Sequence, residues 1–215
     1  MARRNTLATL EADAPLPHFS RADFPLAPGR LERWEPRRLA IDPWTILRLS
    51  RYKRREAVAP AIWETAGSMA ARAEALAEPW ALLAPARVAA TDPAGARLAG
   101  GPRFSGRAVT TLLSGCPLAV AFVLTLGPRL EHEVGALAAR RELLESFLLD
   151  TAGWAAIEAA VRALRLDLGA RLRPAGWRIT HRLAPGYADW PLEEQAALLG
   201  LFAEAEPPAR LLPAS

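Results

Sequence analysis

"PLAVAFVLTLG", residues 117–127, is the longest apolar run of the chain and contains the β-branched residues that favour strands. The run is far too short to span a membrane, so it predicts a central strand of a sheet. Gly127 and Pro128 end this strand. The pattern from Arg129 to Leu172 is helical, and it predicts two helices that meet near 143–145 or 151–153.

Upstream of this strand the sequence predicts two helices and a second strand. Asp42 is a suitable N-cap for a helix with Pro43 at its first position. Pro60 opens a second helix that continues to about Glu78. "ARVAAT" (86–91) predicts a short strand, and "DPAGARLAGG" (92–101) predicts a turn-rich connection.

Downstream, "GWRITHRLAPGY" (176–187) alternates apolar and polar residues, which predicts a half-exposed strand that ends before Pro185. A final helix is expected from Pro191. Helices and strands are interspersed without regular strand–helix alternation, which favours an α+β domain with a mainly antiparallel sheet flanked by helices.

The chain of 215 residues is predicted to hold one domain, residues 41–206. Residues 1–40 are a Pro/Arg-rich N-terminal extension in which five prolines interrupt any helix. The sequence does not decide whether this extension wraps the domain or is disordered. Residues 207–215 form a short tail.

The net charge of +4 is concentrated in residues 1–56, which contain twelve Lys or Arg and seven Asp or Glu. Such a front section suits nucleic acid or a membrane surface. Arginine-rich coding bias explains it better, because Lys53 is the single lysine and no basic stripe alternates with stacking aromatics. The first residues contain no apolar stretch typical of a signal peptide. We therefore expect a cytoplasmic protein with neither a nucleic acid nor a membrane as its partner.

Several common chemistries lack the residues they need. Cys116 is the single cysteine, which excludes an internal disulfide and predicts a buried thiol. The three histidines show no metal-binding spacing. The glycine-rich "GGPRFSG" (100–106) neither follows a clear strand nor opens a helix, and it lacks the P-loop lysine. Without a nucleophile–base pair, any reactive atoms are expected on bound molecules.

The stretch "HRLAPGYADWPLEEQ" (181–195) combines residues that an ordinary core does not require. Arg182 offers a planar charged fork suited to a carboxylate, and Gly186 allows close approach to the main chain. Tyr187 adds a ring and a hydroxyl. Asp189 could accept from an amine or a ribose hydroxyl, or could cap the helix that starts at Pro191. The alternative is a strand-to-helix turn without a ligand.

This stretch resembles the R-x-x-P-G-Y signature of the activation domain of vitamin B12-dependent methionine synthase. It resembles more closely the R-x-S-P-G-Y-G-D-x-P-L-x-x-Q version of the stand-alone relatives of that domain. "AFVLTLGPRLEHEV" and "LLDTAGWAAIEAAVRAL" resemble two further blocks of the family in the same order, and "IDPWTILRLSRYKR" is a looser match. The resemblance covers roughly residues 41–203. The matching residues of the signature are Arg182, Pro185, Gly186, Tyr187, Asp189, Pro191, Leu192 and Gln195.

The resemblance implies a curved α+β domain that binds S-adenosylmethionine in a shallow groove. In that family the domain supports reductive methylation of inactive cob(II)alamin, with one electron from flavodoxin or another reductase. The protein then only positions and shields the reactants.

Carried over residue by residue, Arg182 would bind the methionine carboxylate, and Gly186 with its neighbours, Pro185 among them, would hold the ligand through main chain. Tyr187 would lie between ligand and corrinoid. Glu158 and Asp42 are candidates for the amine or ribose, although Asp42 could instead only cap a helix and Glu158 only be a solvated helix residue.

The sequence departs from the family at Ala188, where the stand-alone branch has glycine, and in its short C-terminal end. No D-x-H-x-x-G corrinoid signature is present, so cobalamin is expected on a partner: a truncated methionine synthase or another corrinoid methyltransferase. The leading hypothesis is therefore a reactivation subunit. The alternative is an interaction module that binds a corrinoid protein and has lost the ligand.

Overall fold

The computed structural model describes residues 26–36 and 39–205, and these residues form an α+β fold with a curled antiparallel sheet. The greater part of the predicted extension and the tail lies outside the described residues. The described strands are β1 (Glu32–Trp34), β2 (Trp80–Asp92), β3 (Gly95–Leu98), β4 (Arg103–Ser105) and β5 (Leu118–Thr125). The described α-helices are α1 (Pro43–Leu49), α2 (Pro60–Leu76), α3 (Arg107–Leu113), α4 (Arg129–Ala139), α5 (Leu143–Leu172) and α6 (Gln195–Gly200).

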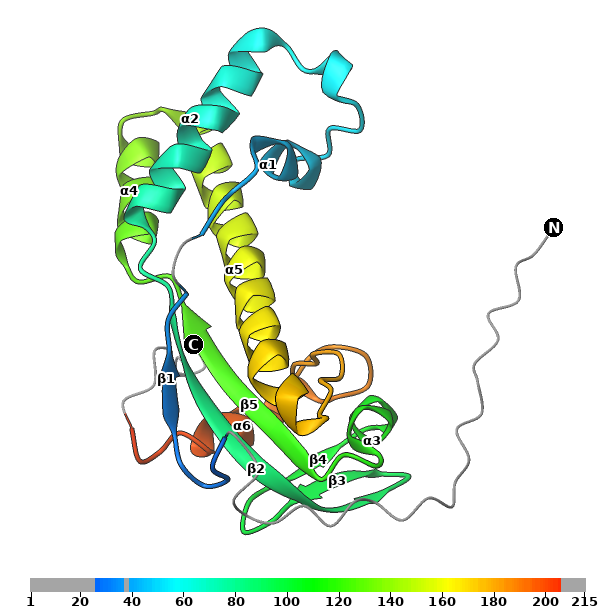
Figure 1. Cartoon of the computed structure of the whole chain (residues 1–215). Helices are drawn as coiled ribbons and strands as arrows, with labels where there is room; N and C mark the ends of the chain where they lie inside the picture. Colours follow the sequence, from blue (N-terminus) through cyan, green and yellow to red (C-terminus); the bar gives the residue numbers. More distant parts are fainter. Residues whose placement is uncertain (1–25, 37–38, 206–215) are drawn as a thin grey trace, which may run out of the picture.

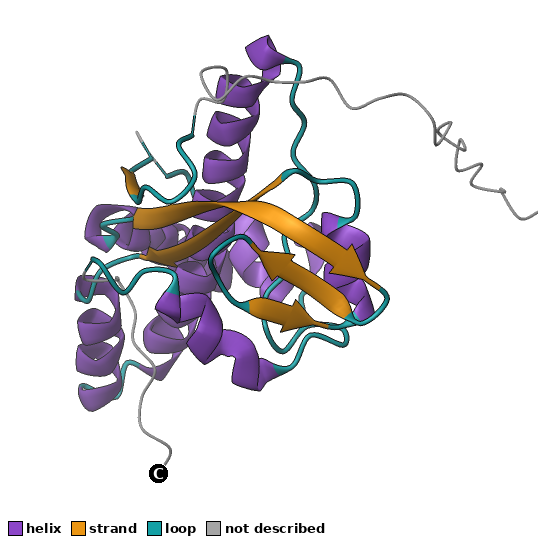
Figure 2. Ribbon diagram, turned by 90° about the horizontal axis from the view of Figure 1, so that it is seen from below, coloured by secondary structure: helices purple, strands orange, loops and turns teal. Residues whose placement is uncertain are grey.

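Strand β2 organises the sheet because every other strand except β4 pairs with it. Its first half lies between β1 and β5, with Leu83 opposite both Glu32 and Phe122. Its second half pairs with β3, and β3 pairs with β4. The register shifts between Val88 and Ala90, an irregularity of the kind that bends a strand. Figure 2 shows the resulting curl of the long β2 ribbon.

The strand predicted from residues 117–127 is confirmed as β5, but its predicted central position is wrong. Among the described strands β5 pairs with β2 alone. The apolar run reflects cover on both faces of the sheet. Val120 and Phe122 pack on one face with Leu164 of α5, whereas Ala121 and Val123 pack on the other with Phe202.

Helix α5 connects the group of helices α1, α2 and α4 to the sheet (Figure 1). Its first half packs against α1, α2 and α4 around Leu148, Leu149 and Ala156, all at most 1% exposed. Its second half lies on the sheet through Leu164 and Leu168. The sequence correctly predicts a helix junction near 143–145. The alternative at 151–153 is wrong, because Gly153 lies inside α5, where it admits Leu130 of α4: a Cβ there would lie 3.0 Å from the Leu130 side chain.

The remaining predictions concern the starts of α1 and α2, residues 86–101 and the helix after Pro191. Asp42 caps α1 as expected, accepting from the Trp44 amide at 3.1 Å, and α2 begins at Pro60. The predicted 86–91 strand is part of β2. The connection 92–101 is rich in turns as predicted, but it also contains β3, which the sequence does not predict. The helix expected from Pro191 is a 3-10 turn followed by the short α6.

Strands β1 and β4 and helix α3 lie outside those predictions. Strand β1 comes from the predicted extension and joins the sheet, with Trp34 buried against Ala81 and Leu83. Among the described helices, none combines the length and the apolar composition that crossing a bilayer requires.

Candidate functional site

The segment 177–184 is irregular and has no sheet partner, so the strand predicted there is wrong. The alternation of apolar and polar residues in this segment has another cause. Trp177 packs into the cluster of Leu164 and Leu168 under α5, and Leu183 packs beside Trp190. Between these anchors the chain passes along α5, and the guanidinium of Arg165 donates to the carbonyl of Thr180 at 3.2 Å. The intervening side chains, Arg182 among them, are left exposed.

The Pro-Gly bend that follows is closed by its own main chain. The Gly186 amide donates to the Trp190 carbonyl at 2.9 Å, and the Trp190 amide donates to the Tyr187 carbonyl at 3.1 Å. Pro185 is half-buried, and the Leu192 side chain fills one side of the bend, 3.2 Å from where a Cβ on Gly186 would lie. The Gly186 amide is therefore already used and could not also donate to a ligand.

Ala188 adopts φ +53°, the left-handed conformation that glycine occupies without strain. This explains why a glycine suits this position better. We expect Ala188→Gly to raise the free energy of unfolding by about 0.5–1 kcal/mol, measured by urea denaturation. Ala184→Gly, in the same exposed segment but at ordinary φ, should lower it. A loss of stability in Ala188→Gly would contradict the strain described here.

Asp189 attaches this bend to helix α3. Its Oδ2 accepts from the Arg107 amide at 2.7 Å and its Oδ1 from the Ala108 amide at 2.9 Å, which are the first two residues of α3. These bonds from Ala108 and Arg107 hold the pKa of Asp189 below its usual value. The expectation that Asp189 caps the helix after Pro191 is wrong, because the capped helix is α3. With both oxygens so engaged, the carboxylate is a structural group.

Glu194 forms a second attachment between the same two regions. Its carboxylate accepts from the amide and hydroxyl of Ser105 on β4 and from the indole N–H of Trp190 at 2.9 Å. Burial of this carboxylate raises its pKa, but the hydrogen bonds from Ser105 and Trp190 outweigh that effect, so the net pKa is lowered. Trp190 itself packs edge-on against Phe104. The segment 185–194 is thus fixed on β4 and α3.

These carboxylates make the attachment sensitive to acid. A carboxyl group whose pKa falls on folding stabilises the fold above its unfolded pKa and loses this effect as the pH falls through its folded pKa. Asp189 and Glu194 both have lowered pKa values, and Arg103 lowers that of Asp92 on β2 from 3.8 to about 2. The free energy of unfolding should therefore fall as the pH drops from 4.5 to about 2.

The check on this prediction is chemical denaturation across that range. Asp189→Asn should flatten the decline, because its amide does not titrate. A decline that is equally steep in Asp189→Asn would show that Asp189 contributes nothing to the acid response.

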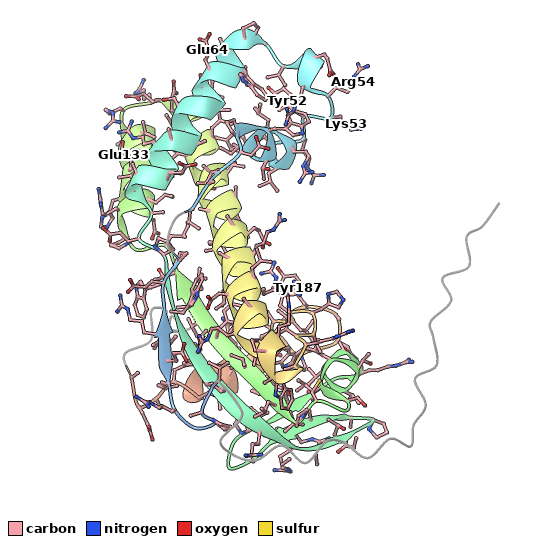
Figure 3. All side chains as sticks on the ribbon, in the orientation of Figure 1. Tyr52, Lys53, Arg54, Glu64, Glu133 and Tyr187 are labelled. Atoms are coloured by element: carbon pink, nitrogen blue, oxygen red, sulfur yellow. The ribbon has the colours of Figure 1, made fainter. Side chains whose placement is uncertain are left out.

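Arg182 pairs with Glu158 of α5, and Tyr187 follows Arg182 by five residues in the same exposed segment. The Arg182 Nη2 lies 2.6 Å from Glu158 Oε1, and the two side chains are 44% and 59% exposed. Ion pairs this exposed contribute about 0–1 kcal/mol, so solvent or a ligand can replace either partner at little cost. Tyr187 is 67% exposed, and Figure 3 shows it beside α5.

Asp42 does not belong to this group. It lies at the start of α1, packed at the other end of α5, where its carboxylate caps the helix and lies 3.9 Å from Arg55. The alternative that Asp42 only caps a helix therefore describes its position. The structure thus brings Arg182 and Glu158 together, leaves Tyr187 exposed in the adjoining bend, engages Asp189 on α3 and places Asp42 apart.

Sequence reasoning missed a row of exposed apolar side chains on α5. Leu143, Phe147 and Trp154 are 67%, 55% and 64% exposed. Their spacing of four and seven residues places them on one helix face, and Glu158 follows Trp154 by four on the same face. We call these three residues the α5 stripe; it leads directly to the Arg182–Glu158 pair. The spacing is visible in the sequence, but a core helix has the same spacing.

Cys116 and the metal-ligating residues offer no alternative site. The Cys116 thiol is half-buried, its Sγ lies 3.5 Å from the Leu112 carbonyl, and burial raises its pKa, which disfavours the thiolate. Across residues 26–36 and 39–205, no three His, Cys, Asp or Glu side chains gather as metal ligands.

A cavity of about 500 Å³ lies between α2 and the residues Pro36 and Leu39. Glu74 lines it, and its carboxylate already accepts from the Ile41 amide at 2.7 Å. This cavity includes none of the residues around Arg182.

Known proteins give no direct help with identity: neither a family model nor a curated protein matches this chain. The fold class and the group around Arg182 are therefore the basis for a functional hypothesis.

Proposed function

We propose that this protein is a stand-alone counterpart of the methionine synthase activation domain. It binds S-adenosylmethionine beside Arg182, Glu158 and Tyr187, and it supports reductive methylation of cob(II)alamin on a separate corrinoid protein. The proposed partner is a methionine synthase that lacks its own activation domain, and flavodoxin or another reductase supplies the electron. The α+β architecture with a curled antiparallel sheet supports this proposal at the level of fold class.

The pairing of Arg182 with Glu158 is the observation that favours this ligand. The amino-acid end of S-adenosylmethionine is a zwitterion, with a carboxylate and an ammonium on the same carbon. A guanidinium and a carboxylate side by side are its electrostatic complement: Arg182 takes the carboxylate in a charge-assisted, bidentate bond, and Glu158 takes the ammonium. The ion pair keeps both side chains in position before the ligand arrives.

The segment 185–194 supplies the rigidity that such a site needs. Asp189 and Glu194 fix this segment on α3 and β4, so Tyr187 is presented from an anchored bend. The exposed ring then packs against the ligand on one side and faces the corrinoid on the other. When bound, S-adenosylmethionine supplies the methyl group and the reduced cobalt on the partner supplies the nucleophile. The chain itself orients the ligand and excludes water.

A second candidate function is an interaction module that binds a corrinoid protein and has lost the ligand. The use of the Gly186 amide inside its own bend favours this alternative. The two functions differ in whether the protein binds S-adenosylmethionine.

The test uses the reaction itself. The protein is mixed with the cob(II)alamin form of a methionine synthase without an activation domain, with S-adenosylmethionine and reduced flavodoxin. We expect the visible spectrum to change to that of methylcobalamin only when the protein and S-adenosylmethionine are both present. Formation of a stable complex without this change, and without ligand binding, would support the interaction module instead.

A further inference from the structure

The α5 stripe is a large apolar surface without cover from the described residues. Its three members are each more than half exposed. Tryptophan, tyrosine and arginine are the residues that most often dominate binding at protein interfaces. Trp154 lies one helical turn from Glu158 and therefore close to the Arg182 pair.

Unpaired cations lie on α1 and on its connection to α2, and α1 packs against the half of α5 that carries the stripe. Helix α1 packs against α5 through its buried Ile46 and Leu47, which leaves its other face and the connection to α2 in solvent. Figure 3 shows Lys53 and Arg54 on this connection. We call the exposed cations here the basic tip; they are Arg48, Arg51, Lys53 and Arg54. None of the four has an ion-pair partner in residues 26–36 and 39–205, and Leu49 among them is 50% exposed.

The opposite end of the stripe is also positive. Arg162 on α5 and Arg178 on the following segment are exposed, and neither has a carboxylate partner in the described part of the chain. In Figure 1 the basic tip and the segment 177–190 project on the same side of α5, at its two ends. Asp150 is an exposed carboxylate within the stripe. Exposed cations therefore lie on the elements at both ends of the part of α5 that carries the stripe.

We propose that the α5 stripe and the basic tip form one docking surface for a protein partner that presents an apolar patch bordered by carboxylates. An apolar centre with a charged rim is the usual anatomy of a protein interface. Complementary rim charges speed association and fix orientation. The identity of the partner as the corrinoid protein rests on the proposed function, but the chemistry of the surface does not.

Two other occupants fit the same surface less well. A second copy of this chain would place one positive rim against another, which repels in either two-fold orientation. A nucleic acid would need rings free for stacking near the cations, but Arg55 covers Trp44 and Trp63 at 5.3 and 5.7 Å from the ring centroids. The exposed rings of Phe147 and Trp154 lie on the same helix face as the carboxylates of Asp150 and Glu158, which repel a phosphate backbone.

The experiment measures binding of the full chain to a cobalamin-loaded methionine synthase fragment without an activation domain. Trp154→Ala should weaken binding at least tenfold, as expected for a central aromatic. Leu166→Ala is the matched control, because Leu166 is also on α5 and 67% exposed but lies about 120° away around the helix.

Reversal of Arg51, Lys53 and Arg54 to glutamate should slow association and remove most of its dependence on salt between about 50 and about 300 mM. Arg97→Glu on β3 is the charge control.

Each outcome decides one question. Equal binding by Trp154→Ala and Leu166→Ala, or association by the wild type that does not respond to salt, would overturn the docking surface. S-adenosylmethionine binding, measured in parallel by calorimetry, tests the proposed function separately. Ligand binding without capture of the fragment refutes the docking surface and leaves the ligand site in place. Capture of the fragment that depends on Trp154 and on salt, without ligand binding, supports the docking surface and refutes the ligand site.

Discussion

Replacement of Gly106 by alanine is expected to lower the free energy of unfolding by about 2–4 kcal/mol, the largest effect of a small substitution that we predict. Gly106 has φ +107°, a conformation that is strained for any residue with a Cβ. A Cβ there would lie 2.7 Å from the Asp189 carbonyl oxygen, which is backbone and cannot rotate away. The added methyl would push the 185–194 segment off α3.

Gly100→Ala separates the cost of a positive φ from the cost of the contact between the new Cβ and Asp189. Gly100 also has positive φ, +67°, but nothing lies within 4 Å of its would-be Cβ. It should therefore cost only about 1 kcal/mol. Both variants are compared by urea denaturation at neutral pH. Equal losses in the two variants would show that the close approach of Asp189 has no energetic importance.

The same contact explains what the glycine-rich "GGPRFSG" does. The expectation that it neither follows a strand nor opens a helix is wrong, because it follows β3, contains β4 and opens α3 at Arg107. It lacks the P-loop lysine, and the structure gives the last of its glycines a packing role. This role could not be predicted, because Asp189 is far away in the chain and the pairing depends on the fold. The capping type of Asp189 is recognisable from its sequence, whereas the identity of the capped helix is not.

The fold was predictable where one segment decides it. Capping by Asp42, the start of α2 at Pro60 and the strand at 118–125 all depend on neighbouring residues. The position of β5 was not predictable, because a continuous apolar run marks cover on both faces and says nothing of how many strands lie beside it. The alternation at 177–183 failed for a related reason. Trp177 and Leu183 anchor in two different clusters, which produces a strand-like period without a sheet.

The candidate site was predictable in part. Arg182 and Tyr187 were singled out from their residue types and the resemblance, and both are exposed on one side of α5. The pairing of Glu158 with Arg182 was not predictable, because the sequence is equally consistent with Glu158 as a solvated helix residue. The α5 stripe was missed because a helical apolar period normally marks a buried face, and only the packing of α1, α2 and α4 shows which face stays open.

Arg182→Ala is expected to weaken S-adenosylmethionine binding by about 1.5–3 kcal/mol, roughly 10- to 150-fold, the scale of a hydrogen bond to a charged group. The ion pair that it breaks is exposed, so the fold should keep its stability. Arg182→Lys should recover part of the affinity, since it restores the charge without the planar fork. Glu158→Gln should also weaken binding, because it removes the charge that faces the ammonium.

The most direct measurement is therefore a calorimetric titration of S-adenosylmethionine into the wild type, Arg182→Ala and Arg97→Ala. Arg97 is an exposed arginine on β3, which makes its variant the control for loss of one positive charge. We predict saturable binding to the wild type and to Arg97→Ala, and a loss of at least tenfold in Arg182→Ala. Absence of binding by the wild type, or equal affinity in all three proteins, would contradict a ligand site at Arg182.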